Sequence, residues 1–243
     1  QSWFVVSSFV ATLILYVIML LASTWGMLIF LGIRFYRSMY TDEGYLSHTL
    51  PVTANQLFLS KVLVSGVWYL FITIGIGISV VALIVSLMTG LLNIGELSSV
   101  LTQYNGNIWE FLADAFYELG RTYEEEMGIN LLHYGITLLL TYVAGPFIAM
   151  VTLFGALTIG QLSSKHKGFM GILAYAGVTI LSSIIGSTVQ SAFMFGTNVM
   201  SSQSGISVSA NSAYDINVIT SLLLAAIMYG VSYYIMNKKL NLD

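Results

Sequence analysis

The segment "VLVSGVWYLFITIGIGISVVALIVSLM", residues 62–88, contains no Asp, Glu, Lys or Arg. It is longer than the ~20 apolar residues with which an α-helix crosses the hydrocarbon core of a bilayer. Four other stretches of the chain are also long, apolar and free of these charged residues. None of them shows the alternation that is typical of a transmembrane β-barrel strand. The sequence therefore predicts five membrane-spanning helices, near residues 4–31, 62–88, 131–159, 169–195 and 216–236.

The composition of the whole chain supports this prediction. Of its 243 residues, 57% are hydrophobic and 8% are charged, and the mean hydropathy is +0.85. In a soluble domain, about a quarter of the residues are charged. The net charge of -3 is too small to indicate a nucleic-acid partner, and the absence of Cys excludes disulfides and thiolate chemistry. We expect an all-α, polytopic integral membrane protein with a single transmembrane domain over residues 1–243.

The Lys and Arg residues predict the orientation of these helices. Successive connections between spans lie on alternate sides of the membrane, and all basic residues except Arg121 fall on the same side. Because cytoplasmic loops are enriched in Lys and Arg, the segment 34–61 and the C-terminus are predicted to be cytoplasmic. We expect the protein to lie in the cell (plasma) membrane. The loops 89–130 and 196–215 are then extracellular. Residue 1 would also lie outside, so we expect a sixth span before Gln1.

The first outer loop contains a predicted amphipathic helix. Apolar residues recur at helical spacing over residues 108–119. Asn107 fits the N-cap of this helix, and the Glu110 carboxylate is placed to accept the backbone N–H of Asn107 in return. Gly120 fits the C-terminal end of the helix. We expect this helix to lie on the outer surface, either as a lid on the ends of the spans or against lipid.

The same loop is rich in acidic residues. A solvated helix face explains them, and a patch that attracts a cationic substrate or partner is the functional alternative. The residues of this candidate outer acidic patch are Asp114, Glu118, Glu124, Glu125 and Glu126.

The predicted cytoplasmic segment carries two helix-start signals. Thr41, followed directly by two acidic residues, suits a helix N-terminus. Pro51 interrupts the chain, and Thr53 with Gln56 forms a capping box that can open a helix continuous with the second span. The sequence therefore predicts two short helices joined by a Pro-containing elbow, exposed to a partner.

The predicted spans offer no group for catalysis or ion coupling. They contain no charged residue, and their only His is His133, near the outer end of the third span. We interpret His133 as a surface or structural residue rather than a ligand or proton relay. The His residues have no metal-binding spacing, and no nucleophile elbow or phosphate-binding loop occurs. We therefore predict that the chain is not an enzyme and has no catalytic residue, metal site or cofactor of its own.

Small and polar residues within the spans have two interpretations. Pairs of small residues four apart favour close helix packing. In the alternative interpretation, glycines such as Gly145, which precedes Pro146, are points at which a helix flexes. The pairs are Gly75 with Ser79, Gly145 with Ala149, Ala156 with Gly160, Ser182 with Gly186, and Ala226 with Gly230. Polar side chains of the fourth span suit helix–helix contacts, and the alternative is a substrate path. The candidate path residues are Ser183, Ser187 and Gln190.

The segment "FYRSMYTDEGYLSHTLPVTANQLFLSKVL", residues 35–63, resembles the signature of a family of bacterial ABC transporter permeases of the type-2 exporter kind. In that family a similar pattern follows the second of six spanning helices. The resemblance covers about an eighth of the chain, and the rest agrees in hydropathy and in the number of later spans. It implies a type-2 ABC exporter-like fold in which the first span of this chain corresponds to the second span of the family.

The resemblance also implies partners and a function. The segment would dock onto a separate ABC ATPase subunit, present in two copies, which binds ATP and Mg. A second permease subunit, identical or different, would complete an exporter that moves a substrate, such as a peptide or an antimicrobial, outward across the bilayer. Asp42 and Glu43 would meet basic or N–H groups of the ATPase, and Gly44 would permit close approach. The implied ATPase-coupling residues are Thr41, Asp42, Glu43, Gly44, Tyr45, Leu46, Leu50 and Pro51.

A second class of function uses the same segment. A non-transporting membrane sensor or scaffold subunit would also dock a cytoplasmic partner there, and ATP hydrolysis without vectorial transport would distinguish it from an exporter. An ion-coupled carrier working alone is disfavoured, because the predicted spans lack charged residues.

Overall fold

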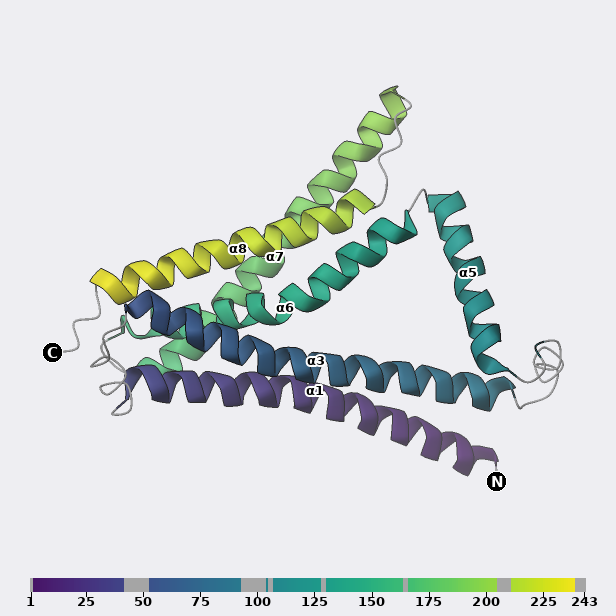
Figure 1. The fold of residues 1–243 in the computed structure, drawn as a ribbon, viewed down its shortest axis with the longest axis horizontal. Helices are drawn as coiled ribbons and strands as arrows, with labels where there is room; N and C mark the ends of the chain where they lie inside the picture. Colours follow the sequence, from purple (N-terminus) through teal and green to yellow (C-terminus); the bar gives the residue numbers. More distant parts are fainter. Residues whose placement is uncertain are drawn as a thin grey trace. The chain divides into compact units, whose positions relative to one another are not determined.

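A computed structural model describes residues 2–41, 53–92, 104, 107–127, 130–163, 166–204 and 211–238, some helical residues only as backbone. This described part is nearly all α-helical and contains no strand. Its helices, drawn in Figure 1, are α1 (Ser2–Tyr40), α3 (Ala54–Leu92), α5 (Ile108–Met127), α6 (Leu131–Gly160), α7 (Lys167–Ser204) and α8 (Asn211–Lys238).

Five of these helices are long and apolar enough to cross a membrane, so the prediction of five spanning helices in an all-α protein is confirmed at this level. The stretches that meet this criterion are Ser7–Tyr40, Asn55–Gly90, Leu131–Gly160, Lys167–Gly196 and Tyr214–Asn237. The helices extend past the predicted ends. α1, for example, continues through Arg34 and Arg37 to Tyr40, because Arg has a high helix propensity and its long side chain remains solvated at the end of a span.

The start of α3 has the capping box that the sequence predicts. The Thr53 N–H donates to Gln56 Oε1 at 3.1 Å, and the Gln56 N–H donates to Thr53 Oγ1 at 3.3 Å. These two bonds satisfy N–H groups that the first turn of a helix leaves unpaired. α3 then runs without interruption to Leu92. The predicted continuity between the capping box and the second span is therefore confirmed.

The ends of α5 agree with the sequence prediction in one respect and differ in two. Asn107 is the N-cap, since its Oδ1 accepts the Trp109 N–H at 3.1 Å. The prediction that the Glu110 carboxylate accepts the Asn107 N–H is wrong, because this N–H donates to the Tyr104 carbonyl oxygen at 2.8 Å instead. The predicted stop at Gly120 is also wrong, because α5 continues to Met127. An ideal Cβ on Gly120 would lie 2.6 Å from Leu131 Cδ1, so this glycine permits a close contact rather than ending the helix.

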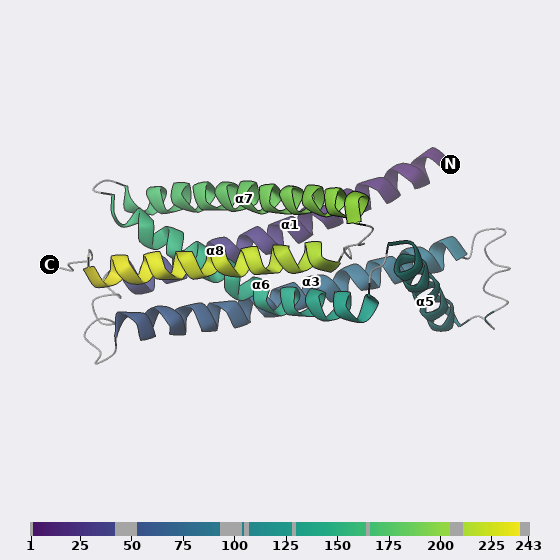
Figure 2. The ribbon, with the colours of Figure 1, turned by 90° about the horizontal axis from the view of Figure 1, so that it is seen from above.

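The chain divides into two compact units. Unit 1 consists of Gln1–Ile76, Val143–Ser182 and Leu222–Asp243, and contains α1, the first part of α3 and parts of α6, α7 and α8. Unit 2 consists of Gly77–Tyr142 and Ser183–Ser221, and contains α5 with the remaining parts of the other four helices. α3, α6, α7 and α8 each contribute residues to both units, and α7 and α8 can be followed along their length in Figure 2.

Unit 1 has an aromatic and aliphatic core. Phe35 of α1 stacks on Phe154 of α6 with ring centroids 4.0 Å apart and an interplanar angle of 4°. Phe58 of α3 meets Phe35 edge to face, with centroids 6.0 Å apart. Met236 brings α8 into the same cluster. All buried apolar side chains of the described residues belong to unit 1: Leu28, Leu31, Phe35, Met39, Phe58, Val62, Met150, Leu153, Phe154, Ala156, Leu157, Ala225, Met228, Ile235 and Met236.

Within unit 1, α6 and α7 approach backbone to backbone. A Cβ on Gly160 would collide with the Gly171 backbone, and Ala156, four residues earlier, is fully buried. The predicted packing role is therefore confirmed for the pair of Ala156 and Gly160. It is wrong, within this chain, for the glycines of the other pairs, which have no atom within 4 Å of an added Cβ: Gly75, Gly145, Gly186 and Gly230.

Unit 2 brings α5 to the start of α6 through the contact between Gly120 and Leu131. At the same end of α6, the ring of Tyr134 meets that of Tyr214 of α8 edge to face, with centroids 4.8 Å apart. α5 runs across the direction of α3, whose residues 77–92 belong to the same unit (Figure 1). No apolar side chain among the described residues of unit 2 is buried.

Candidate functional site

Most of the predicted ATPase-coupling residues lie outside the described residues. These are Asp42, Glu43, Gly44, Tyr45, Leu46, Leu50 and Pro51. The structure does describe Thr41, which directly follows α1 and is exposed. Its hydroxyl donates to the Arg37 carbonyl oxygen at 2.5 Å. This bond satisfies a backbone carbonyl in the last turn of α1. Its role as the N-cap of a following helix stays a prediction.

The residue before Thr41 is fixed to the core of unit 1. The hydroxyl oxygens of Tyr40 and Thr158 are 2.8 Å apart. The Thr158 hydroxyl already donates its single proton to the Phe154 carbonyl oxygen at 2.8 Å, so Tyr40 is the donor in its bond with Thr158. Thr158 is fully buried. The last residue of α1 is therefore hydrogen-bonded into the interior of the unit, to α6.

The other border of the segment is fixed in a similar way. Asn55, the second residue of α3, accepts a hydrogen bond on Oδ1 from the Tyr229 hydroxyl of α8. The Tyr229 ring also packs on Phe58, with centroids 5.9 Å apart. The chain from Thr41 to Thr53 is thus held at both borders, on one side to α6 and on the other to α8. Both attachments lie in unit 1.

The sequence did not predict the hydrogen bonds that these four anchoring residues make. A usable signal was present, because Thr158 and Tyr229 have hydroxyl groups within apolar spans, and Tyr40 and Asn55 have hydrogen-bonding side chains within the segment 35–63. Their pairing was not predictable, because the partners are 118 residues apart in one bond and 174 residues apart in the other. The anchors are Tyr40, Asn55, Thr158 and Tyr229.

The candidate substrate path lies on one helix, α7, within unit 2. Ser183, Ser187 and Gln190 are three or four residues apart and so share one face. The Ser187 hydroxyl donates to the Ile184 carbonyl oxygen of its own helix at 3.0 Å. Ser183 and Ser187 are exposed, and Gln190 is partly buried. The path role stays a prediction.

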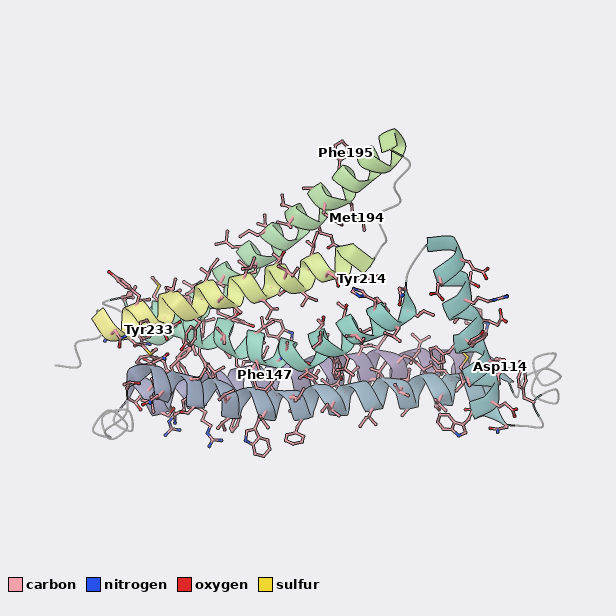
Figure 3. The ribbon with its side chains drawn as sticks, turned by 45° about the horizontal axis from the view of Figure 1, so that its top comes forward. Asp114, Phe147, Met194, Phe195, Tyr214 and Tyr233 are labelled. Atoms are coloured by element: carbon pink, nitrogen blue, oxygen red, sulfur yellow. The ribbon has the colours of Figure 1, made fainter. Side chains whose placement is uncertain are left out.

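The candidate outer acidic patch lies on α5. Asp114, labelled in Figure 3, Glu118, Glu124 and Glu125 are exposed, while the side chain of Glu126 lies outside the described residues. Arg121 neutralises part of the patch, because its guanidinium Nη2 lies 3.0 Å from Glu118 Oε2. The pKa of Tyr104 is raised, first by desolvation and then by the neighbouring Asp114 carboxylate. The Tyr104 ring also meets that of Phe111 edge to face, with centroids 5.6 Å apart, so this tyrosine packs on α5.

His133 has partners that the sequence analysis did not assign to it. Its Nε2 lies 2.9 and 3.0 Å from the two carboxylate oxygens of Asp215, and the Thr137 hydroxyl donates to Asp215 Oδ1 at 3.2 Å. Asn130 is the N-cap of this end of α6, since its Oδ1 accepts the His133 N–H at 3.0 Å. This polar cluster of His133, Thr137 and Asp215 joins α6 to α8 within unit 2.

A signal for Asp215 was present in the sequence. It is the only Asp, Glu, Lys or Arg between Lys167 and Lys238, and a carboxylate at the end of an apolar helix requires a partner or water. Its pairing with His133 fits the interpretation of that His as a structural residue. Among the described residues, no group of three or more His, Cys, Asp or Glu side chains is placed to hold a metal ion.

The chain thus has two candidate sites. In unit 1, the segment between Tyr40 and Asn55 is hydrogen-bonded to α6 and α8 at its two ends, and in unit 2 His133 and Asp215 form a polar cluster. The functional conclusion depends on the chemistry of these residues. No protein-family model matches the sequence, and no curated protein or solved structure matches it significantly.

Proposed function

We propose that this chain is the membrane-spanning permease subunit of an ATP-driven ABC exporter of the type-2 kind. The observation that carries the proposal is the segment of residues 35–63, whose sequence resembles the signature of that family and whose residues Tyr40 and Asn55 are hydrogen-bonded to α6 and α8. A partner that moves this segment would move α1 and α3 together with α6 and α8.

The partner would be a separate ABC ATPase, in two copies, that binds ATP and Mg. Asp42 and Glu43 would contact basic or N–H groups on its surface. A second permease subunit, identical or different, would complete the exporter in the plasma membrane. The charge distribution supports a cytoplasmic position for this end, because Arg34, Arg37 and Lys167 lie at the helix ends of unit 1.

The packing of unit 1 supports mechanical coupling. Close-packed side chains transmit displacement, because they cannot rearrange without losing contacts. The stacked pair of Phe35 and Phe154 lies five residues or fewer from the Tyr40 and Thr158 hydrogen bond. A displacement of the segment would therefore move the spans as rigid bodies, which would switch access to a substrate such as a peptide or an antimicrobial.

Replacing Asp42 and Glu43 by Ala tests the proposal. A hydrogen bond to a charged group contributes about 1.5–3 kcal/mol, so the Kd for the ATPase should rise at least roughly tenfold. The measurement is co-purification and titration of the ATPase on the permease in detergent. The matched control is the replacement of Glu124 and Glu125 by Ala, which removes the same charge from α5.

Unchanged ATPase affinity and unchanged ATP-driven transport in the double variant would contradict the coupling assignment. A further outcome separates the two classes of function. If the complex in vesicles hydrolyses ATP at a rate that no candidate substrate alters, and nothing moves across the membrane, the chain is a sensor or scaffold rather than an exporter.

A further inference from the structure

α5 has an apolar face that the described residues leave open. Trp109, Phe116 and Leu119 are 66%, 71% and 56% exposed. With about 100° of rotation per residue, Trp109 and Phe116 are about 20° apart around the helix axis, and Leu119 is about 60° further. These three side chains therefore form one contiguous stripe, here called the α5 apolar stripe. An exposed apolar patch of this kind indicates an interaction surface.

The other side of α5 is charged. Glu110, Asp114 and Glu118 follow one another at intervals of four residues, and Arg121 pairs with Glu118. Asp114 is about 160° away from Phe116 by the same rotation. Figure 3 shows Asp114 on α5. The helix is thus amphipathic, with a polar side suited to water and an apolar side that needs a different environment.

The contact with α6 lies on the side of α5 that carries Trp109 and Phe116. Gly120 is the residue of α5 that meets Leu131, the first residue of α6. Around the helix axis, Gly120 is only about 20° from Trp109, whereas it is about 120° from Asp114. The face of α5 that turns toward the apolar helix α6 is therefore the one that carries Trp109 and Phe116. Where α6 enters a bilayer, this face points toward lipid.

The direction of α5 fits the same environment. In Figure 1, α5 runs across the direction of residues 77–92 of α3, which belong to the same unit, and in Figure 2 α5 is foreshortened. With α3 crossing a bilayer, a helix in this direction lies along the membrane surface. Its 20 residues extend over about 30 Å. Helices that lie in the interface have one apolar face and place Trp at the level of the lipid headgroups.

We propose that α5 is an interfacial helix, whose apolar stripe of Trp109, Phe116 and Leu119 inserts into the lipid beside α6. The partner of this surface is the bilayer itself, rather than the outer ends of the spans or a second copy of the chain. The acidic side faces water. Because its six acidic residues outnumber its one Arg, the helix favours zwitterionic over anionic headgroups. This inference is independent of any ATPase.

The absence of Cys from the chain makes a direct test possible, since each introduced Cys can be labelled alone. Phe116→Cys and Asp114→Cys receive a nitroxide spin label in the full chain, which is reconstituted in phosphatidylcholine vesicles. Oxygen partitions into lipid and a nickel chelate stays in water. We expect oxygen to relax the label at position 116 more than nickel does, and the reverse at position 114. The same alternation is expected for Trp109→Cys and Glu118→Cys.

Two results would overturn the proposal. Equal access of the nickel chelate to positions 114 and 116 would place both sides of α5 in water. Low access of both reagents to position 116 would mean that protein covers the stripe, as a lid or a second copy would. Both sites are exposed in the structure, so labelling perturbs no core contact, and retention of the monodisperse elution profile of the parent chain verifies folding.

Discussion

Unit 1 and unit 2 differ in where their apolar side chains lie, although both consist of apolar helices. Large exposed apolar side chains occur in both units, such as Phe71 in unit 1 and Phe195 in unit 2, the latter labelled in Figure 3, but every buried apolar side chain of the described residues is in unit 1. Lipid tails are as apolar as Leu, so hydrophobicity alone does not bring such helices together. The two units therefore differ in packing: unit 1 has a core of contacts within the chain, and the described residues of unit 2 form no such core.

The hydrogen bonds follow the same division. The inter-helix bonds of unit 1 engage Thr158, which is fully buried, and Asn55, which is partly buried. The cluster of His133 and Asp215 in unit 2 is exposed over about half and about a third of its side chains. Regions with few buried contacts open at the lowest free-energy cost. If the chain changes conformation during a transport cycle, we expect unit 1 to move as a body and unit 2 to rearrange.

The largest difference between the units should come from truncation of a core side chain. Phe154 is fully buried and stacked on Phe35, so Phe154→Ala should lower the free energy of unfolding by about 3 kcal/mol, the lower end of the range for such cavities. The lower end applies because lipid, rather than water, is the alternative environment for the ring. Leu139→Ala on the same helix, but in unit 2 and 63% exposed, is the control. Denaturant titration in micelles measures both, and equal losses would contradict the comparison.

Glycine substitution gives a smaller contrast, with opposite signs in the two units. Gly160→Ala places a methyl group against the Gly171 backbone, and we expect it to cost about 1–3 kcal/mol, as overpacking does. Gly186→Ala meets no atom within 4 Å and should stabilise α7 by up to about 1 kcal/mol through helix propensity. Thermal unfolding of both variants measures the two effects. A neutral Gly160→Ala variant would mean that α6 and α7 are not in backbone contact.

The smallest effect is expected for the polar cluster of His133, Thr137 and Asp215. A double-mutant cycle on His133→Ala and Asp215→Ala should give a coupling energy of about 0.2–1 kcal/mol, because the pair is partly exposed and solvent screens it. Thr137→Val, which removes the second donor to Asp215, serves as a further comparison. A coupling energy well above this range would show that the cluster holds α6 to α8 more strongly than its exposure allows, and would weaken the contrast between the units.

Local features of the fold were predictable from the sequence. The five apolar helices, the capping box of Thr53 and Gln56 and the N-cap at Asn107 all depend on residues within four positions of one another, or on composition. Hydrogen bonds of a helix and its caps close over this short range, so their signals are contiguous in the chain. The resemblance of residues 35–63 to an exporter permease is also a local feature, and the function it implies stays a prediction.

The tertiary structure decided which of these residues meet. The sequence alone did not predict that Gly120 contacts Leu131 instead of ending α5, or that His133 pairs with Asp215. It also did not predict which of the five pairs of small residues packs closely; among the described residues, the glycine of only one pair, Ala156 with Gly160, has a close contact. In a chain this apolar, most helix faces are chemically equivalent, so a pattern of apolar or small residues does not specify which face is packed. Shape complementarity between distant segments makes that choice, and it exists only once the helices are placed together.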